Sequence, residues 1–516
     1  MAQTVDTNGW HTIAAIKYAD VNKAIARDKK GPTKFDQGSP DGKEKANGNF
    51  GPWTLTTGGA GTTLIMELPI IEGTITIDGT AYPITACVAK VAVKATFLPQ
   101  SGSSVESLVN DKSQPVSVAA CEPVQSDFAA AAALPRLLET WLNSNLSEFN
   151  AVFASVDLDA DYNVGMDWLK PSFRGYAVAE PAYSPTLENS VFAVMCLIDN
   201  TDEPAGLLWQ ISPYAIPPTA KGAFLVAPEK FLEHMILPVV PAMFTGIKDA
   251  PARDHFRIDN AGTRICNRTD VKLMSVKLDN HKEVSPAIAA QNFAIQLESG
   301  EIVLSIADMT FEYSPGITLH LNYTLRCGLT LSENHLDFTV LEQTGSGSVE
   351  VSKGLDIAQI VLGATSIVLA LVSGGTGAVS KVADAAIVST TEATTVAVEN
   401  AVMDENEAEL AVVNGLKGII KGTVPEVREL SSRLMAVVKV AVVGGFCCTL
   451  LPAFVQIMQA IANGDYNKIP RIGDLVNDHV GKTVKWPADA GGFVLNSAQL
   501  NGALQFGLIE TPTNPS

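Results

Sequence analysis

The 516-residue sequence has little positive charge. Its 36 Lys and Arg residues are outnumbered by 55 Asp and Glu residues, which gives a net charge of −19 at pH 7. Proteins that bind nucleic acid concentrate Lys and Arg on one face, so no nucleic acid is expected as a partner. A local basic patch would still allow contact with phospholipid head groups, so a membrane surface stays among the partners to consider.

Signals for secretion and for disulfide bonding are missing as well. Residues 1–10 contain neither a basic region nor an apolar core, so we expect a protein made in the cytoplasm without a signal peptide. Any release would then follow a non-Sec route. The seven cysteines include no Cys-x-x-Cys, so we expect reduced, mostly buried thiols. Cys447 and Cys448 are the alternative redox pair, but a disulfide between adjacent residues is strained.

Recognisable catalytic and metal-binding motifs are also missing. The Gly-Lys-Thr at 481–483 resembles the end of a phosphate-binding loop, but Val476 stands where that motif requires Gly. The histidines form no pair at ligand spacing on one helix face, and the acidic run 399–409 lacks the spacing and the Gly of an EF-hand. We therefore expect no enzyme activity, no catalytic residues, no metal site and no cofactor.

The sequence does contain one unusually long alternating segment. Residues 317–331 alternate between apolar side chains and polar residues or Gly, which indicates a strand with one apolar face. At about 3.3 Å per residue the strand would span roughly 50 Å, whereas a usual strand has about five or six residues. Such a strand needs a long apolar surface against one face. An alternating apolar face is usually part of a protein core. The length of this strand makes Leu319, Leu321, Tyr323 and Leu325 candidates to line an apolar ligand site instead.

A helical period replaces this alternation in residues 124–153. Apolar residues recur there at spacings of three and four, which is typical of an amphipathic helix, and Pro135 predicts a kink or a restart. The candidate lining residues on this helix are Leu134, Leu138, Trp141 and Leu142. Residues 224–244 carry a second helical pattern, broken near Pro238 and Pro241.

Strand patterns dominate the remaining chain up to about residue 350. Asp78-Gly79 between two β-branched runs predicts a hairpin. Farther along, the runs 293–297, 302–306 and 309–313 predict separate strands. Together these patterns predict an elongated α+β fold of strands and helices with an apolar interior. We expect one domain at 1–250 and a second that combines 251–352 with 465–516.

Residues 353–464 differ from this β pattern and predict an inserted apolar helical module in the C-terminal third. Its apolar runs, 355–372 and 434–461, flank the acidic run 399–409. The first run is borderline in length for a bilayer core of about 30 Å. The preferred interpretation is a buried helical pair. The alternative is a membrane hairpin that inserts once nearby carboxylates are protonated.

Short motifs toward both ends of the chain resemble one known family. The motifs are Asn8-Gly-Trp10, Asn49-Phe-Gly-Pro-Trp53, Gly58-Gly-Ala-Gly-Thr-Thr-Leu64, Glu67-Leu-Pro-Ile70 and the closing segment Gly492–Phe506. They are similar to motifs of the Clostridium P-forty-seven family of neurotoxin-cluster accessory proteins, which is related to the OrfX proteins.

The resemblance implies the tubular lipid-binding (TULIP) fold. We therefore expect elongated, strongly bent antiparallel sheets wrapped around long helices, an arrangement that can leave an apolar tunnel. It also implies a non-enzymatic protein of a toxin-type gene cluster that binds lipid or another hydrophobic small molecule. The alternative is a component of a toxin or insecticidal complex, with a protein partner, whose helical module associates with membranes.

Overall fold

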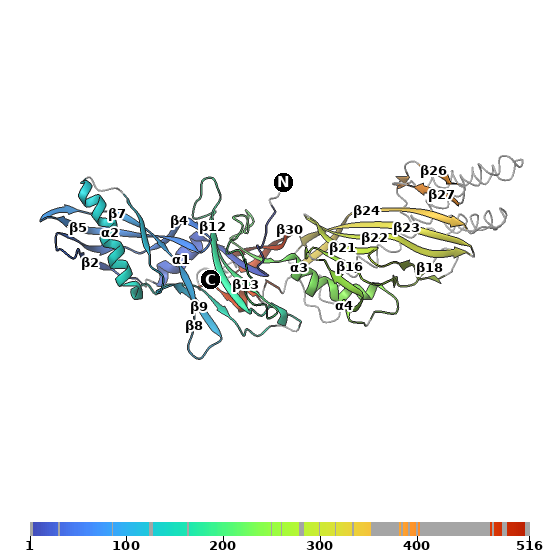
Figure 1. Cartoon of the computed structure of the whole chain (residues 1–516), viewed down its shortest axis with the longest axis horizontal. Coiled ribbons are helices and arrows are strands. Elements are labelled where there is room, and N and C mark those ends of the chain that lie inside the picture. The colour runs from blue at the N-terminus through green and yellow to red at the C-terminus, as the bar shows by residue number, and fades with distance from the viewer. Residues whose placement is uncertain are drawn as a thin grey trace, which may run out of the picture. The chain divides into compact units, whose positions relative to one another are not determined.

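The computed structural model describes residues 4–351, 381–402 and 475–510, apart from gaps at 29–30, 85, 123–126, 163–164, 249, 260, 278–282, 299, 315, 333–334, 383–384, 391–392, 399–400, 477–478 and 488–492. Most of the described chain forms antiparallel sheets, with few helices (Figure 1). The chain divides into two compact units. The first contains residues 1–227, 331–335 and 470–516, and the second contains residues 228–330 and 336–469.

Six strands of the first unit form a sheet that combines early and late parts of the sequence. In order across the sheet they are β12 (Phe173–Ala179), β13 (Val191–Leu197), β1 (Thr12–Lys17), β14 (Gly222–Val226), β31 (Ala503–Glu510) and β30 (Phe493–Asn501). β13 and β14 are buried along their whole length. Residues 465–516 were expected to join 251–352, but β31 instead pairs with β14 and places Phe506 opposite Phe224.

A second sheet of the first unit has seven strands. Its path is β10 (Ser117–Glu122), β7 (Cys87–Val93), β5 (Thr63–Ile77), β3 (Glu44–Phe50) and β2 (Lys34–Gly38), with β4 (Thr54–Ala60) and β6 (Thr80–Pro83) paired to β5. The hairpin predicted at Asp78-Gly79 is confirmed, because Ile77 pairs with Thr80 and both turn residues have positive φ.

Helix α2 (Phe128–Ser144) confirms the amphipathic helix expected within residues 124–153. The side chain of Asp127 caps its first turn by accepting a hydrogen bond from the N–H of Ala130. Pro135 lies inside the helix and does not start a new one. α2 contacts both edge strands of the path, β10 and β2, as well as β3 and β5, so the sheet curls around it (Figure 1).

The glycine-rich motif at 58–64 has a structural role in the first unit. Gly58 and Gly61 have positive φ, which glycine adopts at no steric cost. The carboxylate of Glu180 accepts hydrogen bonds from the N–H groups of Gly58 and Gly59 at 2.7 and 2.9 Å. Gly61 forms an isolated bridge with Val178 of β12. The motif therefore connects the seven-stranded sheet to the six-stranded one.

The other elements of the first unit are helical turns, one longer helix and a small sheet. They are α1 (Tyr18–Asp28), the 3-10 turns η1 (Leu146–Glu148) and η2 (Asp167–Leu169), the π-helix η5 (His479–Thr483), and the sheet β29 (Val484–Lys485), β11 (Val152–Asp157), β9 (Val105–Asn110) and β8 (Ala95–Pro99).

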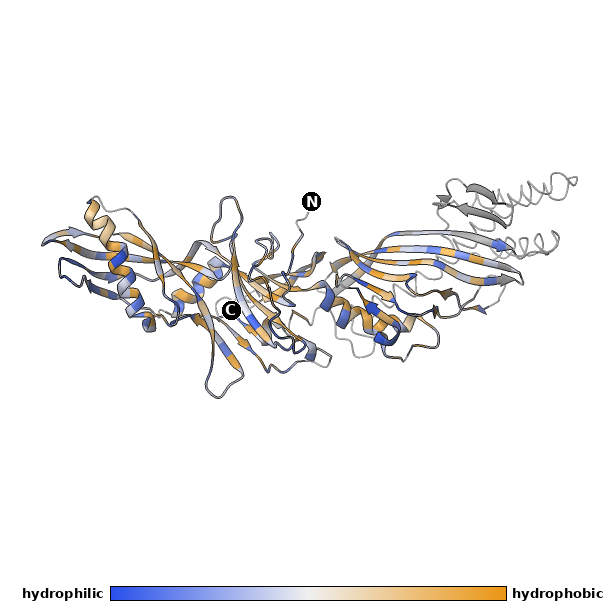
Figure 2. Cartoon of the chain, in the orientation of Figure 1, coloured by the Kyte–Doolittle hydropathy of each residue, from blue (hydrophilic) through white to orange (hydrophobic). Residues whose placement is uncertain are grey.

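The second unit contains a ten-stranded antiparallel sheet. Its path is β15 (Phe256–Ile258), β16 (Arg264–Asn267), β21 (Phe293–Glu298), β22 (Glu301–Ser314), β23 (Ile317–Ser332), β24 (His335–Val351), β27 (Ala393–Val398) and β26 (Ala385–Thr390), with β17 (Val271–Lys272) and β20 (Ala287–Ile288) beside it. Hydrophobic and hydrophilic residues alternate along its long strands in Figure 2. A separate pair consists of β18 (Val276–Lys277) and β19 (Glu283–Val284).

Strand β23 confirms the long strand expected at 317–331, and it is 16 residues long. Its partner β22 runs through two runs that were expected to be separate strands. The pairing register shifts between Ile306 and Met309, and Asp308 adopts a φ of 46°. A bulge of this kind breaks the alternation in sequence without ending the strand.

The helix expected at 224–244 is replaced by shorter pieces. Residues up to Val226 belong to β14, and three short segments follow: α3 (Pro228–Phe231), the π-helix η3 (Leu232–Ile236) and the 3-10 helix η4 (Leu237–Met243). Pro238 and Pro241 cannot donate the hydrogen bonds of a continuing α-helix, which accounts for the change. Helix α4 (Ala252–His255) follows.

Most of the helical module expected at 353–464 lies outside the described residues, including both apolar runs. Its described part is extended and not helical. It forms the strands β25 (Lys381–Val382), β26, β27 and β28 (Ala401–Val402). In the part of the chain that the structure describes, no helix has the length and apolar character needed to cross a membrane.

Candidate apolar ligand site

The eight residues expected to line an apolar site fall into two groups that belong to different units. Leu134, Leu138, Trp141 and Leu142 lie on α2 in the first unit, and Leu319, Leu321, Tyr323 and Leu325 lie on β23 in the second. All eight side chains are buried, with 8% or less of their surface exposed. Each group therefore belongs to the core of its own unit. We assign the two groups to separate cores and not to one common ligand site.

A small apolar cavity lies beside α2 in the first unit. Its volume is about 20 Å³, which is room for roughly one water molecule. Of the eight expected residues, Leu142 is the one that lines it. The complete lining consists of Trp53, Met66, Leu68, Val91, Val93, Asn110, Val116, Leu142, Leu146 and Phe149.

The sheet side of this cavity follows from strand register. Met66 of β5 pairs with Val91 of β7, and alternate residues on each strand face the same side. The alternation of Val91 and Val93 was visible in the sequence, but nothing local connected it to α2. Pairing with β5 and the curl of the sheet bring these side chains to the helix.

The opposite side of the cavity is closed by the chain that follows α2. Phe149 packs edge-on against Trp53, with 4.8 Å between ring centroids. Leu146 belongs to the 3-10 turn η1, in which no residue is fully buried. The cavity is thus separated from solvent at this point by a short turn and not by a sheet or a long helix.

Two buried polar side chains interrupt the apolar lining. Trp53 and Asn110 are each 5% exposed, and neither Trp53 Nε1 nor Asn110 Oδ1 has a hydrogen-bond partner among the described residues. A buried polar atom without a partner costs about 1–3 kcal/mol. Asn110 was not predicted, because a single polar residue at a strand end carries no distinguishing signal. A group that donates a hydrogen bond to Asn110 Oδ1 would remove this cost.

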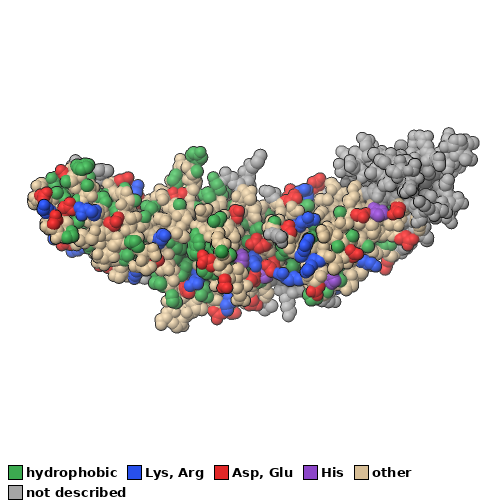
Figure 3. Space-filling model, viewed as in Figure 1, with side chains coloured by type: hydrophobic (Ala, Val, Ile, Leu, Met, Phe, Trp, Pro, Cys, Tyr) green, Lys and Arg blue, Asp and Glu red, His purple; other side chains and the backbone are tan. Residues whose placement is uncertain are grey.

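An open groove of about 730 Å³ crosses β2, β3 and β5 in the first unit, and its lining differs in character. Cross-strand pairing aligns Lys34, Asn49 and Glu72 in one row. Asn49 donates a hydrogen bond to Glu72 at 2.5 Å. The face visible in Figure 3 likewise mixes acidic and basic side chains. Such a polar groove does not suit an acyl chain.

His320 lies on the polar face of β23 and joins three strands of the second unit. Its Nδ1 is 2.6 Å from Asp308 Oδ1 and its Nε2 is 3.3 Å from Glu350 Oε2. Partial burial lowers the pKa of His320, but the hydrogen bonds to the two carboxylates outweigh burial and raise it overall. Because the two carboxylates contact different ring nitrogens, His320 links Asp308 of β22 to Glu350 of β24 and stabilises the pairing of the three strands.

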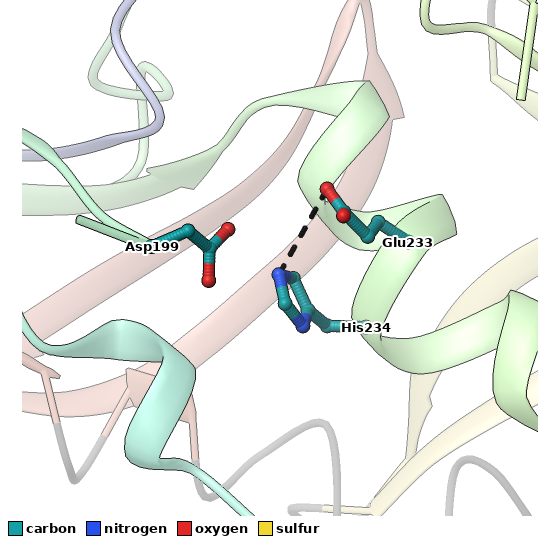
Figure 4. A group of neighbouring side chains, drawn as sticks. All are labelled: Asp199, Glu233 and His234. Atoms are coloured by element: carbon teal, nitrogen blue, oxygen red, sulfur yellow. Dashed lines mark ion pairs between the residues drawn. The ribbon is translucent and has the colours of Figure 1, made fainter. Parts of the chain in front are cut away.

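Glu233 and His234 form a second ionisable group in this unit, on the π-helix η3 (Figure 4). His234 Nε2 is 3.9 Å from Glu233 Oε2. The same carboxylate pairs with Lys230 at 3.1 Å and with Arg253. Two cations already balance Glu233, so its contacts are those of an ion-pair network that holds α3, η3 and α4 together.

Comparison with known proteins identifies a family model and related proteins that this chain matches. A model of the OrfX-like family, described as protein OrfX2/OrfX3/P47, matches residues 7–427 and 390–508. Protein OrfX3 of Clostridium botulinum (strain Kyoto / Type A2) is 27% identical over 293 residues, which is 50% of this chain and 58% of that protein. Protein OrfX3 of Paraclostridium bifermentans is 26% identical over 291 residues, with the same shares. The matches thus span little more than half the length of these relatives.

Two solved structures share the fold along nearly the whole chain. P47 from Clostridium botulinum A2 has a TM-score of 0.57 at 14% identity and covers 98% of both chains. P47 of Clostridium botulinum E1 has a TM-score of 0.56 at 12% identity and covers 98% of this chain and 99% of that one. At such identities the likeness concerns the fold alone.

Proposed function

Since the chain belongs to the OrfX-like family, we propose that it is a non-enzymatic accessory protein of a toxin-type gene cluster that binds a hydrophobic small molecule. The binding site is the apolar cavity between α2 and the seven-stranded sheet of the first unit. We further propose that this curled sheet with its enclosed helix is a TULIP-like arrangement. The curl of the sheet around α2 supports that assignment.

The observation that carries the proposal is the composition of the cavity wall. Eight of its ten residues are apolar side chains other than Trp53, and the two polar atoms without partners belong to Trp53 and Asn110. Burial of an acyl chain in such surroundings contributes about 0.8 kcal/mol per methylene. A ligand with a hydroxyl or another hydrogen-bond donor at one end would match Asn110 Oδ1.

The size of the cavity determines how a ligand would enter. A volume of about 20 Å³ holds one hydroxyl or methyl group and no chain, so a longer ligand must displace part of the wall. The turn η1 is the weakest part of that wall, because none of its residues is fully buried. Entry past Leu146 and Phe149 therefore disrupts the fewest core contacts.

Organic extraction and mass spectrometry of the purified full-length chain test this proposal. We expect a hydrophobe from the wild type and from Leu98→Trp, a control at an exposed strand residue. Leu146→Trp, which places a bulky ring at the cavity wall, should lose the hydrophobe.

A second readout is quenching of tryptophan emission by 11-bromoundecanol. Trp53 lines the cavity, so Trp53→Phe should remove the saturable part of the quenching. The proposal is wrong if the wild type yields no extractable hydrophobe and shows no saturable quenching.

The second candidate function is a toxin-complex component with a protein partner, whose residues 353–464 associate with a membrane surface. Its support is the pair of apolar runs on either side of an acidic run in the sequence. Carboxylates lose their charge at low pH, which removes a barrier to insertion. A pH-dependent liposome experiment tests this candidate.

A further inference from the structure

Two thiols meet on neighbouring strands of the first unit. Cys87 begins β7, and Cys121 lies next to the end of β10. Cys121 pairs with Ala89, so Cys87 is its diagonal neighbour on the same face of the sheet. The two thiols are hydrogen-bonded to each other. The two side chains therefore face each other across the strand pair.

The other described cysteines have different surroundings. Cys196 is completely buried and hydrogen-bonded to Thr12, and Cys266 accepts a hydrogen bond from Arg257 at 3.4 Å. Cys327 is buried on β23. Among the five cysteines that the structure describes, Cys121 alone is partly exposed, and its diagonal neighbour Cys87 is buried.

We propose that Cys87 and Cys121 are a redox modification site, at which oxidation forms a reversible disulfide between β7 and the edge strand β10. The oxidant is a small-molecule disulfide such as oxidised glutathione. The Cys121 thiolate attacks one sulfur of that disulfide, which breaks its S–S bond and releases one glutathione thiol. The Cys87 thiolate then attacks the Cys121 sulfur and releases the second. Both protein thiols lose a proton, and the two electrons they give up reduce the glutathione disulfide.

The local backbone permits this closure. Diagonal neighbours across an antiparallel pair lie about 7–8 Å apart at Cα, which is beyond the roughly 4.4–6.8 Å that a disulfide spans, so the backbone must move for the bond to form. Both cysteines lie at strand ends, and the β7–β10 register already shifts between Val118 and Ala120. A small movement of the end of β10 therefore brings the sulfur atoms to bonding distance without disturbing the centre of the sheet.

The environment also sets the rate of oxidation. The hydrogen bond with Cys87 and burial raise the pKa of Cys121, so little thiolate exists at neutral pH. Exchange is then slow at pH 7 and accelerates as the pH rises. A pair of this kind stays reduced in a reducing cytoplasm and becomes oxidised on long exposure to an oxidising medium.

The disulfide would act on the part of the sheet that holds α2. The N–H of Val118 on β10 donates to Glu139 of α2 at 2.9 Å, and the N–H of Val116 donates to Asn143 at 2.9 Å. A covalent link between β10 and β7 restrains this edge and, through it, the contact with the helix. This inference stands independently of the ligand proposal.

The test uses the full-length chain with oxidised glutathione at about pH 8, followed by peptide mapping. We expect the wild type and the matched control Cys327→Ser to lose the mass of two hydrogens and to yield one cross-linked peptide pair containing Cys87 and Cys121. Dithiothreitol should reverse the change. Mapping also separates this product from any involving Cys447 or Cys448.

Single variants test the order of the two steps. Cys87→Ser should retain a glutathione adduct on Cys121, because no resolving thiol is present. Cys121→Ser should leave Cys87 unmodified. The oxidised wild type should also unfold at a higher temperature than the reduced form. Recovery of Cys87 and Cys121 as free thiols after prolonged oxidation, or a lasting glutathione adduct on wild-type Cys121, would overturn the proposal.

Discussion

Replacing Val91 by Ile tests whether the space beside α2 is a real void. Val91 lies on β7, is buried, and lines the cavity. Isoleucine adds one methylene group to the same branched side chain and keeps a high preference for strands. If the void is real, the extra group enters it without displacing neighbours, and the protein becomes more stable.

The expected gain can be worked out from the cavity volume. Removing a cavity of about 20 Å³ at roughly 24 cal/mol per Å³ is worth about 0.5 kcal/mol. Burying one methylene contributes about 0.8 kcal/mol at most, and part of this overlaps with the cavity term. We therefore expect a stabilisation of about 0.5–1 kcal/mol, which raises the melting temperature of the first unit by roughly 1–3 °C.

The control is Val178→Ile on β12, where the side chain is 1% exposed and lines no part of this cavity. Added volume in a filled core typically costs about 1–3 kcal/mol, so this variant should melt at a lower temperature. Calorimetry of both variants gives the comparison. Equal destabilisation of Val91→Ile and Val178→Ile would show that the space is already filled, and the reasoning from its volume would fail.

Three further predictions concern other parts of the chain. The pKa of His320 is raised in the folded protein, so protonated His320 stabilises the fold fully below its pKa in the unfolded chain, about 6.5. This stabilisation is lost as the pH rises through the pKa of His320 in the folded protein. Calorimetry should therefore show that His320→Gln lowers the melting temperature at about pH 6 and much less at about pH 9. Gly175→Ala should destabilise by more than about 1 kcal/mol, because a Cβ atom there would lie 2.6 Å from the Trp10 ring, whereas Gly38→Ala, with its nearest contact at 3.7 Å, should melt within a few degrees of the wild type. In flotation assays the full-length chain should bind anionic liposomes at about pH 4–5 and not at pH 7, and replacing the carboxylates of 399–409 by amides should permit binding at pH 7; binding that does not change with pH would count against the membrane candidate.

Local periodicity was sufficient to predict helices and strands that bury one of their two faces. The alternation at 317–331 and the three-and-four spacing at 134–142 each mark a side that must be buried. The first segment forms β23 and the second forms part of α2. The Asp78-Gly79 turn was equally local, because its positive φ values restrict the residues that fit. These predictions needed no knowledge of which element supplies the opposing surface.

Long-range pairing was not accessible in the same way. Nothing in residues 503–510 identifies β14 as their partner, since an apolar strand fits many edges equally well. The bulge after Ile306 interrupted the alternation and divided β22 into two expected strands. The cavity depends on both kinds of information, because its lining comes from five separate stretches of chain. Sequence patterns therefore found Leu142 but not Val91 or Asn110 as part of one site.

The position of β31 beside β14 has a consequence for biosynthesis. Phe506 of β31 pairs with Phe224 of β14, so the six-stranded sheet of the first unit is incomplete until the second unit has been translated. At about 5–20 residues per second, the ribosome needs roughly 15–60 s to travel from one strand to the other. During that interval the nascent chain exposes an unpaired, fully apolar edge of β14. Such an edge can pair with strands of other chains and aggregate, so it needs the protection of a chaperone.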